Sequence, residues 1–306
     1  MIDIGSNSMR LTLYEVEGER FRTLFREKIM AGLAGYVEHG DLSEEGIACA
    51  CGALGRFGET LRSLGVESVS VFATASLRNI GNTAQAVEAI RAATGYAVEV
   101  IGNEEEALLG YAGAMEELHR RSGAFVDIGG ASTEVVSFEE GRPVAAASFP
   151  MGSLSLYKKC VKKILPGEGS LRRLRKTIGQ TIGEEDFPFA PHSSLACSGG
   201  TARAALKIAG KLYDLPAEEN TVSRKQFRDM CRFLRGGGNE SVDLLLKLAP
   251  DRIHTILPGL MILEEILRRF RAEELVVSRY GVREGYLCLR LLRREQEGEG
   301  AALYRA

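Results

Sequence analysis

The chain has 306 residues, of which 45% are hydrophobic and 26% are charged, and these values are those of an ordinary globular protein. The net charge of −2 at pH 7 excludes a general basic field of the kind that attracts nucleic acid, so a polyanion would have to bind a local patch. A chain of this length exceeds one typical core and predicts two domains.

Cysteine usage and hydropathy limit the environment. The six cysteines form no C-x-x-C pair and the four histidines are scattered, which argues against a zinc site and a disulfide framework. This pattern favours a reducing, cytoplasmic location. The sequence contains no recognisable signal peptide or membrane-length apolar run, and we expect neither a membrane nor a nucleic-acid partner.

The first half of the chain alternates between strand and helix patterns. Ser43 has the character of a helix cap, followed by acidic residues in the first turn. The expected strands are Leu11–Val16, Phe21–Arg26, Val69–Ala73 and Ala97–Ile101. The expected helices are Ser43–Leu64, a segment from Asn82 or Thr83 to about Ala93, and one from Glu104 to about Arg121.

The second half is more helical. The helix near Arg252–Phe270 contains Pro258 and is expected to kink there. The other expected helices are Ser153–Lys163, Ser170–Thr181, one opening near Thr201, Arg224–Leu234, Ser241–Leu248 and Val282–Arg294. The expected strands are one opening at Phe125, Ser194–Cys197 and Leu275–Val277, and the tail Glu295–Gly300 is expected to fray. The alternation predicts an α/β fold with mixed sheets.

One pattern occurs twice in the chain, with a spacing of 124 positions. Ile2–Ser8 reads IDIGSNS and Val126–Ser132 reads VDIGGAS. Each copy is an apolar run with an Asp, a Gly turn with hydroxyl groups, a second alternating run and a hairpin-turn signal. A single copy would be an ordinary hairpin, whereas the pair predicts two similar domains that each offer a loop to one polyphosphorylated ligand in a cleft between them.

The chemistry of the repeated loop fits a phosphate group. Glycine lets the backbone turn its N–H groups toward an anion, and successive N–H groups form an anion-binding nest. Asp3 and Asp127 would repel a phosphate unless a hard cation lies between, and Mg²⁺ binds one or two carboxylates together with phosphate oxygens. The predicted phosphate-binding residues are Gly5, Ser6, Asn7 and Ser8 in the first copy and Gly129, Gly130, Ala131, Ser132 and Thr133 in the second.

With both loops placed, the chain resembles the exopolyphosphatase / guanosine pentaphosphate phosphatase family, part of the larger actin, sugar-kinase and heat-shock-chaperone ATPase fold. The resemblance spans nearly the whole chain, and the stretches around Arg78 and Glu106 separate this family from kinases and chaperones. The matching motifs are Asp3–Ser8 followed by Arg10-Leu11, Ala73–Asn79, Gly102–Ala107, Asp127–Glu134, Cys197–Arg203, Leu257–Gly259 and Gly281–Gly285.

The resemblance implies two actin-like (ribonuclease H-like) domains, residues 1–121 and 122–306, with mixed β-sheets flanked by helices and an active site in the interdomain cleft. The last helix either belongs to the second domain or packs back on the first. Larger members carry a further C-terminal helical domain that grips long polymers. The chain resembles the short form, and it is expected to grip such polymers less firmly.

The implied activity is magnesium-dependent release of terminal phosphate from inorganic polyphosphate or guanosine pentaphosphate. Glu106 is implied as the base for the attacking water and Arg78 as a ligand of phosphate oxygens. Asp3, Asp127 and Glu134 are the implied magnesium ligands. The alternatives are a kinase of the same fold and a nucleotide- or phosphate-sensing protein with weak turnover.

Each of these residues also has a plain structural reading. Acidic residues such as Glu104, Glu105 and Glu106 favour a helix N-terminus through the dipole, and Glu134 could be an outward strand residue. Without the family match, Arg78 is as well explained as a surface residue. Gly199 and Gly200, which face the ligand in the superfamily, are by themselves better explained as a tight turn between a strand and a helix.

Three further features bear on the ligand. Ala131 stands where the family usually has a third glycine, and it would cost about 1 kcal/mol or more if that position requires a positive φ. Leu260–Leu267 is expected to form core or a contact in a homodimer. A basic stretch could either guide a polyanion or form two solvated helix faces, and it comprises Lys158, Lys159, Lys162, Lys163, Arg172, Arg173, Arg175 and Lys176.

Overall fold

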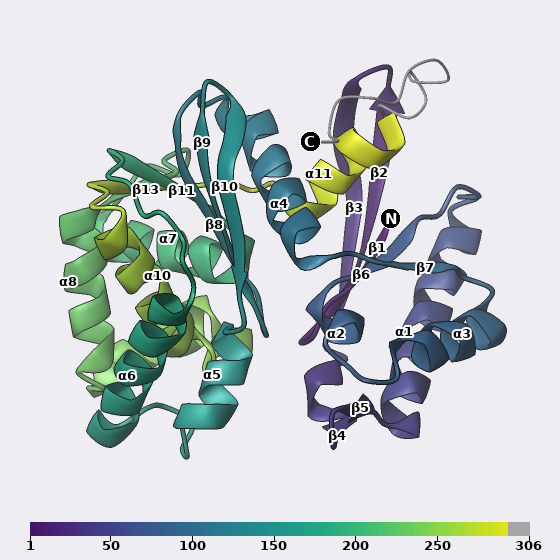
Figure 1. The fold of residues 1–306 in the computed structure, drawn as a ribbon, viewed down its shortest axis with the longest axis horizontal. Coiled ribbons are helices and arrows are strands. Elements are labelled where there is room, and N and C mark those ends of the chain that lie inside the picture. Colours follow the sequence, from purple (N-terminus) through teal and green to yellow (C-terminus); the bar gives the residue numbers. More distant parts are fainter. Residues whose placement is uncertain (293–306) are drawn as a thin grey trace. The chain divides into compact units, whose positions relative to one another are not determined.

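The computed structural model describes residues 1–292, which form two compact units (Figure 1). Unit 1 comprises Met1–Glu106 together with the described residues 286–292, and unit 2 comprises Ala107–Gly285. The boundaries therefore fall within α4 (Asn103–Leu118) and at the end of α11 (Val282–Tyr286), whereas the predicted division after residue 121 lies just beyond α4. No helix in the described part of the chain is long and apolar enough to cross a membrane.

Unit 1 is built on a five-stranded mixed sheet with the order β3-β2-β1-β6-β7. β1, β6 and β7 run parallel, while β1, β2 and β3 pair antiparallel as a meander. The strands are β1 (Ile2–Ile4), β2 (Met9–Glu17), β3 (Arg20–Ile29), β6 (Val71–Ala73) and β7 (Val98–Val100). A separate ribbon pairs β4 (Val37–Glu38) with β5 (Asp41–Leu42).

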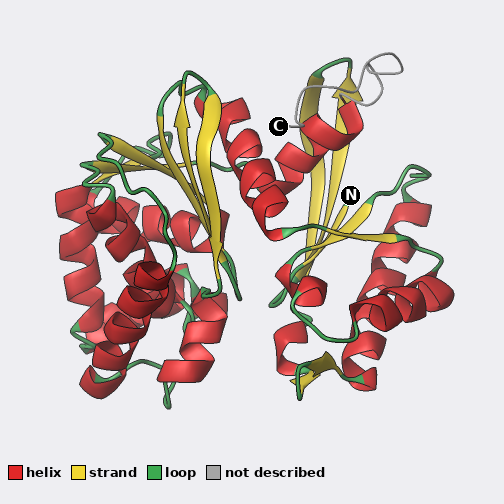
Figure 2. Cartoon of the chain, viewed as in Figure 1, coloured by secondary structure: helices red, strands yellow, loops and turns green. Residues whose placement is uncertain are grey.

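One face of this sheet is covered by α1 (Glu44–Ser63) and α3 (Thr83–Thr94), as Figure 2 shows. The Ser43 hydroxyl accepts a hydrogen bond from the Gly46 N–H, so the predicted cap of α1 is confirmed. The apolar stripe of α1, including Leu54 and Phe57, packs on the alternate strand residues Ile2 and Ile4. Two short elements complete this part of the unit, the 3₁₀ turn Leu33–Gly35 and α2 (Ala75–Arg78).

The last described segment groups with unit 1. After α11 the chain continues as a π-helical turn, Leu287–Leu292. The Tyr286 ring stacks on Phe72 at 4.8 Å between centroids, and its hydroxyl donates to Glu99 at 2.6 Å. Most of the predicted helix Val282–Arg294 is thus accounted for, while its last two residues and the expected frayed tail lie outside the described residues.

Unit 2 is built on a six-stranded mixed sheet with the order β10-β9-β8-β11-β13-β12. β8, β11 and β13 are parallel neighbours, and β8, β9 and β10 form an antiparallel meander. This arrangement repeats that of unit 1, where β1, β6 and β7 take the places of β8, β11 and β13. The strands are β8 (Gly123–Ile128), β9 (Thr133–Glu139), β10 (Arg142–Phe149), β11 (Ser194–Ser198), β12 (Thr221–Ser223) and β13 (Glu274–Val277).

Helices cover both faces of this sheet (Figure 1). Phe125 packs with Tyr111 of α4 on one face, whereas Val126 and Ile128 contribute to the core with α7 and α10 on the other. Burial on both faces explains why β8 has a nearly continuous apolar sequence. The helices are α5 (Ser153–Cys160), α6 (Glu168–Glu184), α7 (Gly199–Tyr213), α8 (Arg224–Arg235), α9 (Asn239–Leu248) and α10 (Ile256–Arg269), with a 3₁₀ turn at Pro250–Arg252.

The predicted α/β class with mixed sheets is confirmed, and one prediction about a helix is wrong. The helix near Arg252–Phe270 is divided into the 3₁₀ turn and α10, so Pro258 lies in the first turn of α10. A proline there removes an N–H that has no intrahelical partner in any case, so it causes no kink. Leu260–Leu267 within α10 is almost entirely buried in unit 2 and forms core.

Candidate functional site

In unit 1, three chain segments leave the carboxyl ends of neighbouring parallel strands. The loop Gly5–Ser8 follows β1, α2 follows β6, and α4 begins after β7. This edge of an open α/β sheet is where ligands usually bind. The Ser76 hydroxyl of α2 donates to the carbonyl oxygen of Ile4, directly before the loop, and so holds two of these segments together.

The first loop is arranged with its carbonyl groups engaged and its N–H groups available. The Ser6 carbonyl accepts from the Ala34 N–H at 2.9 Å, and the Asn7 carbonyl accepts from the Gly32 N–H at 3.0 Å. Within residues 1–292, the N–H groups of Gly5–Ser8 donate no hydrogen bond. A side chain at Gly5 would bring a Cβ to 2.9 Å from the Ser8 carbonyl oxygen, so the tight turn requires glycine.

The second loop has the same construction. A Cβ at Gly129 would lie 3.1 Å from the Ser132 carbonyl oxygen, in the position equivalent to Gly5 and Ser8. The carbonyls of Gly129 and Gly130 accept from the N–H groups of Ser153 and Leu154 at 3.0 and 2.9 Å, in the first turn of α5. The N–H groups of Gly130–Ser132 donate to no other described residue. Both loops therefore present consecutive amides that can bind an anion.

The second loop includes Ala131, where the family usually has glycine, and Thr133, whose hydroxyl is buried. Ala131 is not among the described non-glycine residues with positive φ, so the strain that would follow from a positive φ at this position does not arise. Thr133 is fully buried, and its hydroxyl donates to the Met151 carbonyl oxygen at 2.6 Å. That hydroxyl group therefore donates its hydrogen bond within the protein rather than to a ligand.

Arg78 and Glu106 form a buried ion pair in unit 1. The Arg78 Nη1 donates to Glu106 Oε2 at 2.7 Å and to the Ile101 carbonyl oxygen at 2.8 Å. The exposed fractions of the two side chains are 12% and 10%, so solvent screens the pair little. The Nε and Nη2 of Arg78 are buried and have no hydrogen-bond partner among the described residues. An unpaired buried donor costs about 1–3 kcal/mol, and a phosphate oxygen would satisfy it.

The three consecutive glutamates at the start of α4 differ in their surroundings. Glu104 is exposed, and Glu105 is half-buried and pairs with Arg290 of the same unit. Glu106 is only 8% exposed and is the one that contacts Arg78. The helix dipole explains acidic residues in this turn, but it does not explain why one of them is buried against a guanidinium.

Asp3 lies in β1 directly opposite Arg10 of β2. Residues opposite each other in an antiparallel pair project from the same face of the sheet. Arg10 therefore shares the face of Asp3 beside the first loop. Both residues have electrostatic or hydrogen-bonding partners.

Asp127 and Glu134 form the corresponding pair in unit 2. They lie opposite each other at the loop end of β8 and β9, so their side chains share one face of the sheet. The Ser198 hydroxyl donates to Asp127 Oδ2 at 2.8 Å, and the Ser148 hydroxyl donates to Glu134 Oε1 at 3.0 Å. Glu134 is only 1% exposed, which rules out the alternative of an outward-facing strand residue.

Gly199 and Gly200 are more than a tight turn. Gly199 has a φ of +83°, and a Cβ there would overlap Asp127 Oδ1. A Cβ at Gly200 would overlap the guanidinium of Arg252, which lies against the start of α7. The two glycines therefore let a carboxylate and a guanidinium approach the N-terminus of α7. Their contact with a ligand stays a prediction.

Arg252 is the residue that sequence reasoning missed. Burial lowers the pKa of Arg252, and the carboxylates of Asp251 and Asp127 oppose that shift. Arg252 lies against Gly200 and Asp127 lies against the neighbouring Gly199. A guanidinium beside a helix N-terminus can bind phosphate oxygens bidentately. The only sequence signal was the Gly-Gly pair that accommodates it, and that signal does not identify the distant partner.

The donors around Asp127 fit a magnesium ion. Asp127 and Glu134 offer carboxylate oxygens side by side, and Mg²⁺ binds through one or two carboxylates while keeping water and phosphate ligands. Residues 1–292 contain no group of three or more His, Cys, Asp or Glu side chains that could by itself hold a metal. The fit is therefore to a cation shared with a phosphate ligand rather than to a closed protein cage.

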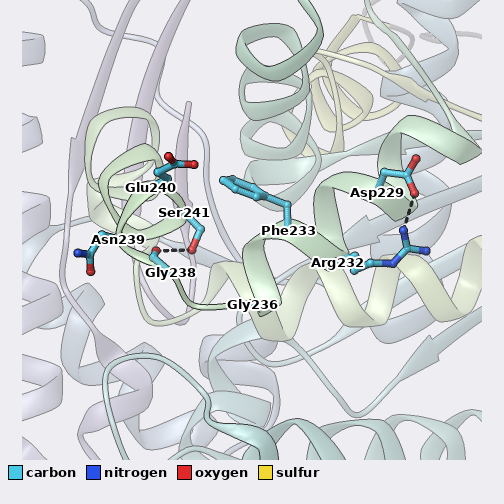
Figure 3. Close-up of a pocket in the computed structure, with 8 residues that line it drawn as sticks. All are labelled: Asp229, Arg232, Phe233, Gly236, Gly238, Asn239, Glu240 and Ser241. Carbon is cyan, nitrogen blue, oxygen red and sulfur yellow. Dashed lines mark hydrogen bonds and ion pairs between the residues drawn. The ribbon is translucent and has the colours of Figure 1, made fainter.

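Unit 2 also contains a pocket of about 630 Å³ between the end of α8 and the start of α9 (Figure 3). Phe233 lines it, together with Arg232 and Asp229, which pair with each other at 3.1 Å. The Ser241 hydroxyl in its wall donates to the Gly238 carbonyl oxygen. None of the predicted site residues lines this pocket, and we assign it no role.

The repeated sheets, each with an equivalent glycine loop after its first parallel strand, define a protein of the actin-like fold. A family model described as the Ppx/GppA phosphatase family matches residues 12–294, which is most of the chain. The chain belongs to the Ppx/GppA phosphatase family.

Two similar proteins agree with this family assignment. The chain is 25% identical over 300 residues to a "Putative exopolyphosphatase" of Haemophilus influenzae, an alignment that covers 94% of this chain and 89% of that protein. It is 28% identical over 305 residues to "Exopolyphosphatase 2" of Mycobacterium tuberculosis, covering 93% and 95%.

Solved structures support the fold. The crystal structure of the Aquifex aeolicus Ppx/GppA family member matches with a TM-score of 0.77 and 24% identity, covering 96% of this chain and 97% of that one. An exopolyphosphatase from Cytophaga hutchinsonii matches with a TM-score of 0.82 and 21% identity, with the same coverage. The expected actin-like fold is therefore confirmed.

Proposed function

We propose that this protein is a magnesium-dependent phosphohydrolase that releases terminal phosphate from inorganic polyphosphate. The observation that supports this most directly is the buried Arg78 guanidinium, with two nitrogens unpaired beside Glu106 and close to the first phosphate loop. A structural ion pair has no need of unsatisfied donors, whereas a site for phosphate oxygens does.

Glu106 is proposed to act as the general base. A water oxygen attacks the terminal phosphorus, a new P–O bond forms, and the bridging P–O bond to the rest of the chain breaks. Glu106 takes the proton that the water loses, and the shortened chain leaves with the bridging oxygen. Phosphoryl transfer depends mostly on positioning and charge neutralisation, so Arg78 and the loop amides are proposed to align the terminal phosphate and to stabilise its oxygens.

Asp127 and Glu134 are the residues of unit 2 that would hold magnesium, and Ser198 and Ser148 orient their carboxylates. When bound, the ion would neutralise phosphate charge that the two carboxylates otherwise repel. Arg252 adds a second fixed positive charge close to Asp127. The role of Asp3 as a further ligand stays a prediction.

Polyphosphate is preferred as substrate because several similar proteins are named exopolyphosphatases. Guanosine pentaphosphate is a second predicted substrate, and a homodimer also remains a prediction. A kinase would transfer the phosphate to an acceptor instead of releasing it, and a sensing protein would bind without release. Phosphate release with magnesium, compared between polyphosphate and guanosine pentaphosphate, distinguishes these functions.

The decisive variant is Glu106→Gln, with Glu104→Gln as the matched control. Both substitutions remove one negative charge from the first turn of α4, but Glu104 is exposed and Glu106 is buried against Arg78. We expect kcat for phosphate release to fall about 10²-fold or more in Glu106→Gln, the usual scale for loss of a general base. Glu104→Gln should retain the wild-type rate. Near-normal turnover in Glu106→Gln would overturn the assignment of the base.

A further inference from the structure

Positive charge is concentrated in one segment of unit 2. Residues 153–184, which form α5, α6 and the connection between them, contain eight Lys and Arg but only two acidic residues, Glu168 and Glu184. The segment therefore carries a charge of +6 in a chain whose net charge is −2. This separation of charge attracts a polyanion to one surface while the remainder of the molecule repels it.

Helix α5 starts directly on the second phosphate loop. The N–H groups of Ser153, Leu154 and Ser155 donate to the carbonyls of Gly129 and Gly130, and the Ser153 hydroxyl also donates to Gly129. Gly152 packs so closely on Gly130 that a Cβ there would overlap its backbone. With a rise of 1.5 Å per residue, Lys159 lies about 9 Å along the helix from this contact. The basic side chains thus begin one to two turns from the loop.

One of the basic residues, Arg173, makes several hydrogen bonds within the protein although it is also exposed. The Arg173 guanidinium donates to the Cys160 carbonyl oxygen at 3.2 and 3.0 Å and to the Ser170 hydroxyl at 2.9 Å, so it fastens α6 to the end of α5. Glu168 approaches Arg172 only at 3.8 Å, with both side chains exposed. The remaining residues are exposed, and we call them the α5–α6 basic surface: Lys158, Lys159, Lys162, Lys163, Arg172, Arg175 and Lys176.

We propose that the α5–α6 basic surface binds the distal part of a linear polyphosphate chain whose near end is held at the second phosphate loop. The inference rests on the proposed function and extends it to the choice of substrate by length. Figure 1 shows α5 and α6 next to each other in this unit, and the two helices that carry these residues pack against each other. Most of these residues are lysines. A lysine carries a point charge on a flexible side chain, which suits a polyphosphate whose charges repeat along its length and do not require hydrogen-bond donors in a fixed arrangement.

The aromatic content of this surface favours polyphosphate over single-stranded nucleic acid. Proteins that bind single strands combine basic grooves with aromatic rings on which bases stack. Tyr157 is the only aromatic residue in residues 153–183. Its ring packs edge-on against His254 at 5.3 Å, and its hydroxyl donates to the Lys163 carbonyl oxygen, so it is engaged within the protein. The surface therefore provides charge without a stacking platform.

The test is direct binding of long-chain polyphosphate and of tripolyphosphate, measured by calorimetry in EDTA so that no turnover is needed. The variant replaces Lys158, Lys159, Lys162 and Lys163 by Gln. We expect the ratio of the two dissociation constants, long over short, to rise about tenfold, which corresponds to about 1.4 kcal/mol. The salt slope of log K for the long chain should become shallower by about 3, taking about 0.7 per lost contact as for single-stranded nucleic acid.

A matched control carries the same change of charge elsewhere on unit 2. Lys211, Lys225, Arg228 and Lys247 are exposed on α7, α8 and α9, and their replacement by Gln should leave both the ratio and the slope at wild-type values. Equal losses in the two variants would indicate a general charge effect and overturn the proposal.

Two further outcomes are informative. Single-stranded RNA that competes with long polyphosphate on the wild type, and that loses affinity in the α5 variant, would overturn the choice of ligand. A wild-type protein that releases no phosphate from any polyphosphate refutes the proposed function, while the binding ratio still decides whether this surface selects long chains.

Discussion

Gly200→Ala is expected to separate stability from activity. A Cβ at Gly200 would overlap the Arg252 guanidinium, which is the far end of a flexible side chain and can move away. Gly200 is not among the described glycines with positive φ, so alanine fits the backbone at the start of α7. The substitution should therefore displace Arg252 without disturbing the fold.

The magnitudes follow from these contacts. Alanine is about 1 kcal/mol more favourable than glycine inside a helix and less so in the first turn, so the free energy of unfolding should change by less than about 1 kcal/mol. A hydrogen bond to a charged group contributes about 1.5–3 kcal/mol. If Arg252 binds a phosphate oxygen, its displacement should lower kcat/KM about 10- to 100-fold.

The assay pairs urea unfolding with phosphate release from polyphosphate. Gly210→Ala is the matched control, because Gly210 lies in the same helix and a Cβ there meets nothing within 4 Å. It should equal or exceed the wild type in stability and retain its activity. If Gly200→Ala keeps full kcat/KM at wild-type stability, Arg252 does not act on the substrate and the reasoning fails.

Two further predictions concern the charged residues. In a double-mutant cycle of Arg78→Met and Glu106→Gln, urea unfolding should give a coupling energy of about 2 kcal/mol. Residues in contact couple by about 0.5–3 kcal/mol, and this pair is buried. If the two changes in the free energy of unfolding add to within about 0.5 kcal/mol, the pair does not form. Asp127→Asn should raise the magnesium concentration needed for half-maximal phosphate release about tenfold or more. Changing even a residue that orients a metal ligand typically lowers metal affinity about 10- to 100-fold. An unchanged magnesium titration in Asp127→Asn would remove that residue from the metal site.

The repeated motif shows how far local sequence signals reach. The residues after each loop predicted a second strand and a hairpin turn, and the structure has turns at Gly18-Glu19 and Glu140-Gly141. Glu140 and Gly141 have φ values of 51° and 76°, as a two-residue type I′ turn requires. These features could be predicted because every determinant lies within a few neighbouring residues.

The elements that the sequence did not predict depend on distant partners. α2 is four residues long and β12 three, too short for any periodic pattern to identify. The expected kink at Pro258 does not occur because α10 begins only at Ile256, so the proline falls in the first turn. Arg252 was missed because its contact with Gly200 joins two remote segments.

The duplicated sheets carry different chemistry at equivalent positions. In unit 1 the helix after β7 presents Glu106 to Arg78, while in unit 2 the helix after β13 uses Glu284 to accept the N–H of Gly281 at its own start. Glu284 is thus engaged as a helix cap, which is the plain structural role that Glu106 could have had.

The same comparison applies to the guanidinium groups. Arg78 comes from the short helix after β6, whereas the corresponding position after β11 holds Gly199 and Gly200 and receives Arg252 from a remote turn. Each unit therefore combines one glycine loop with one guanidinium, but the buried Arg–Glu pair formed by the helices after the parallel strands lies in unit 1. Under the proposed function both loops contact phosphate, whereas the residue proposed as the general base belongs to unit 1, because the equivalent Glu284 is engaged as a cap of its own helix.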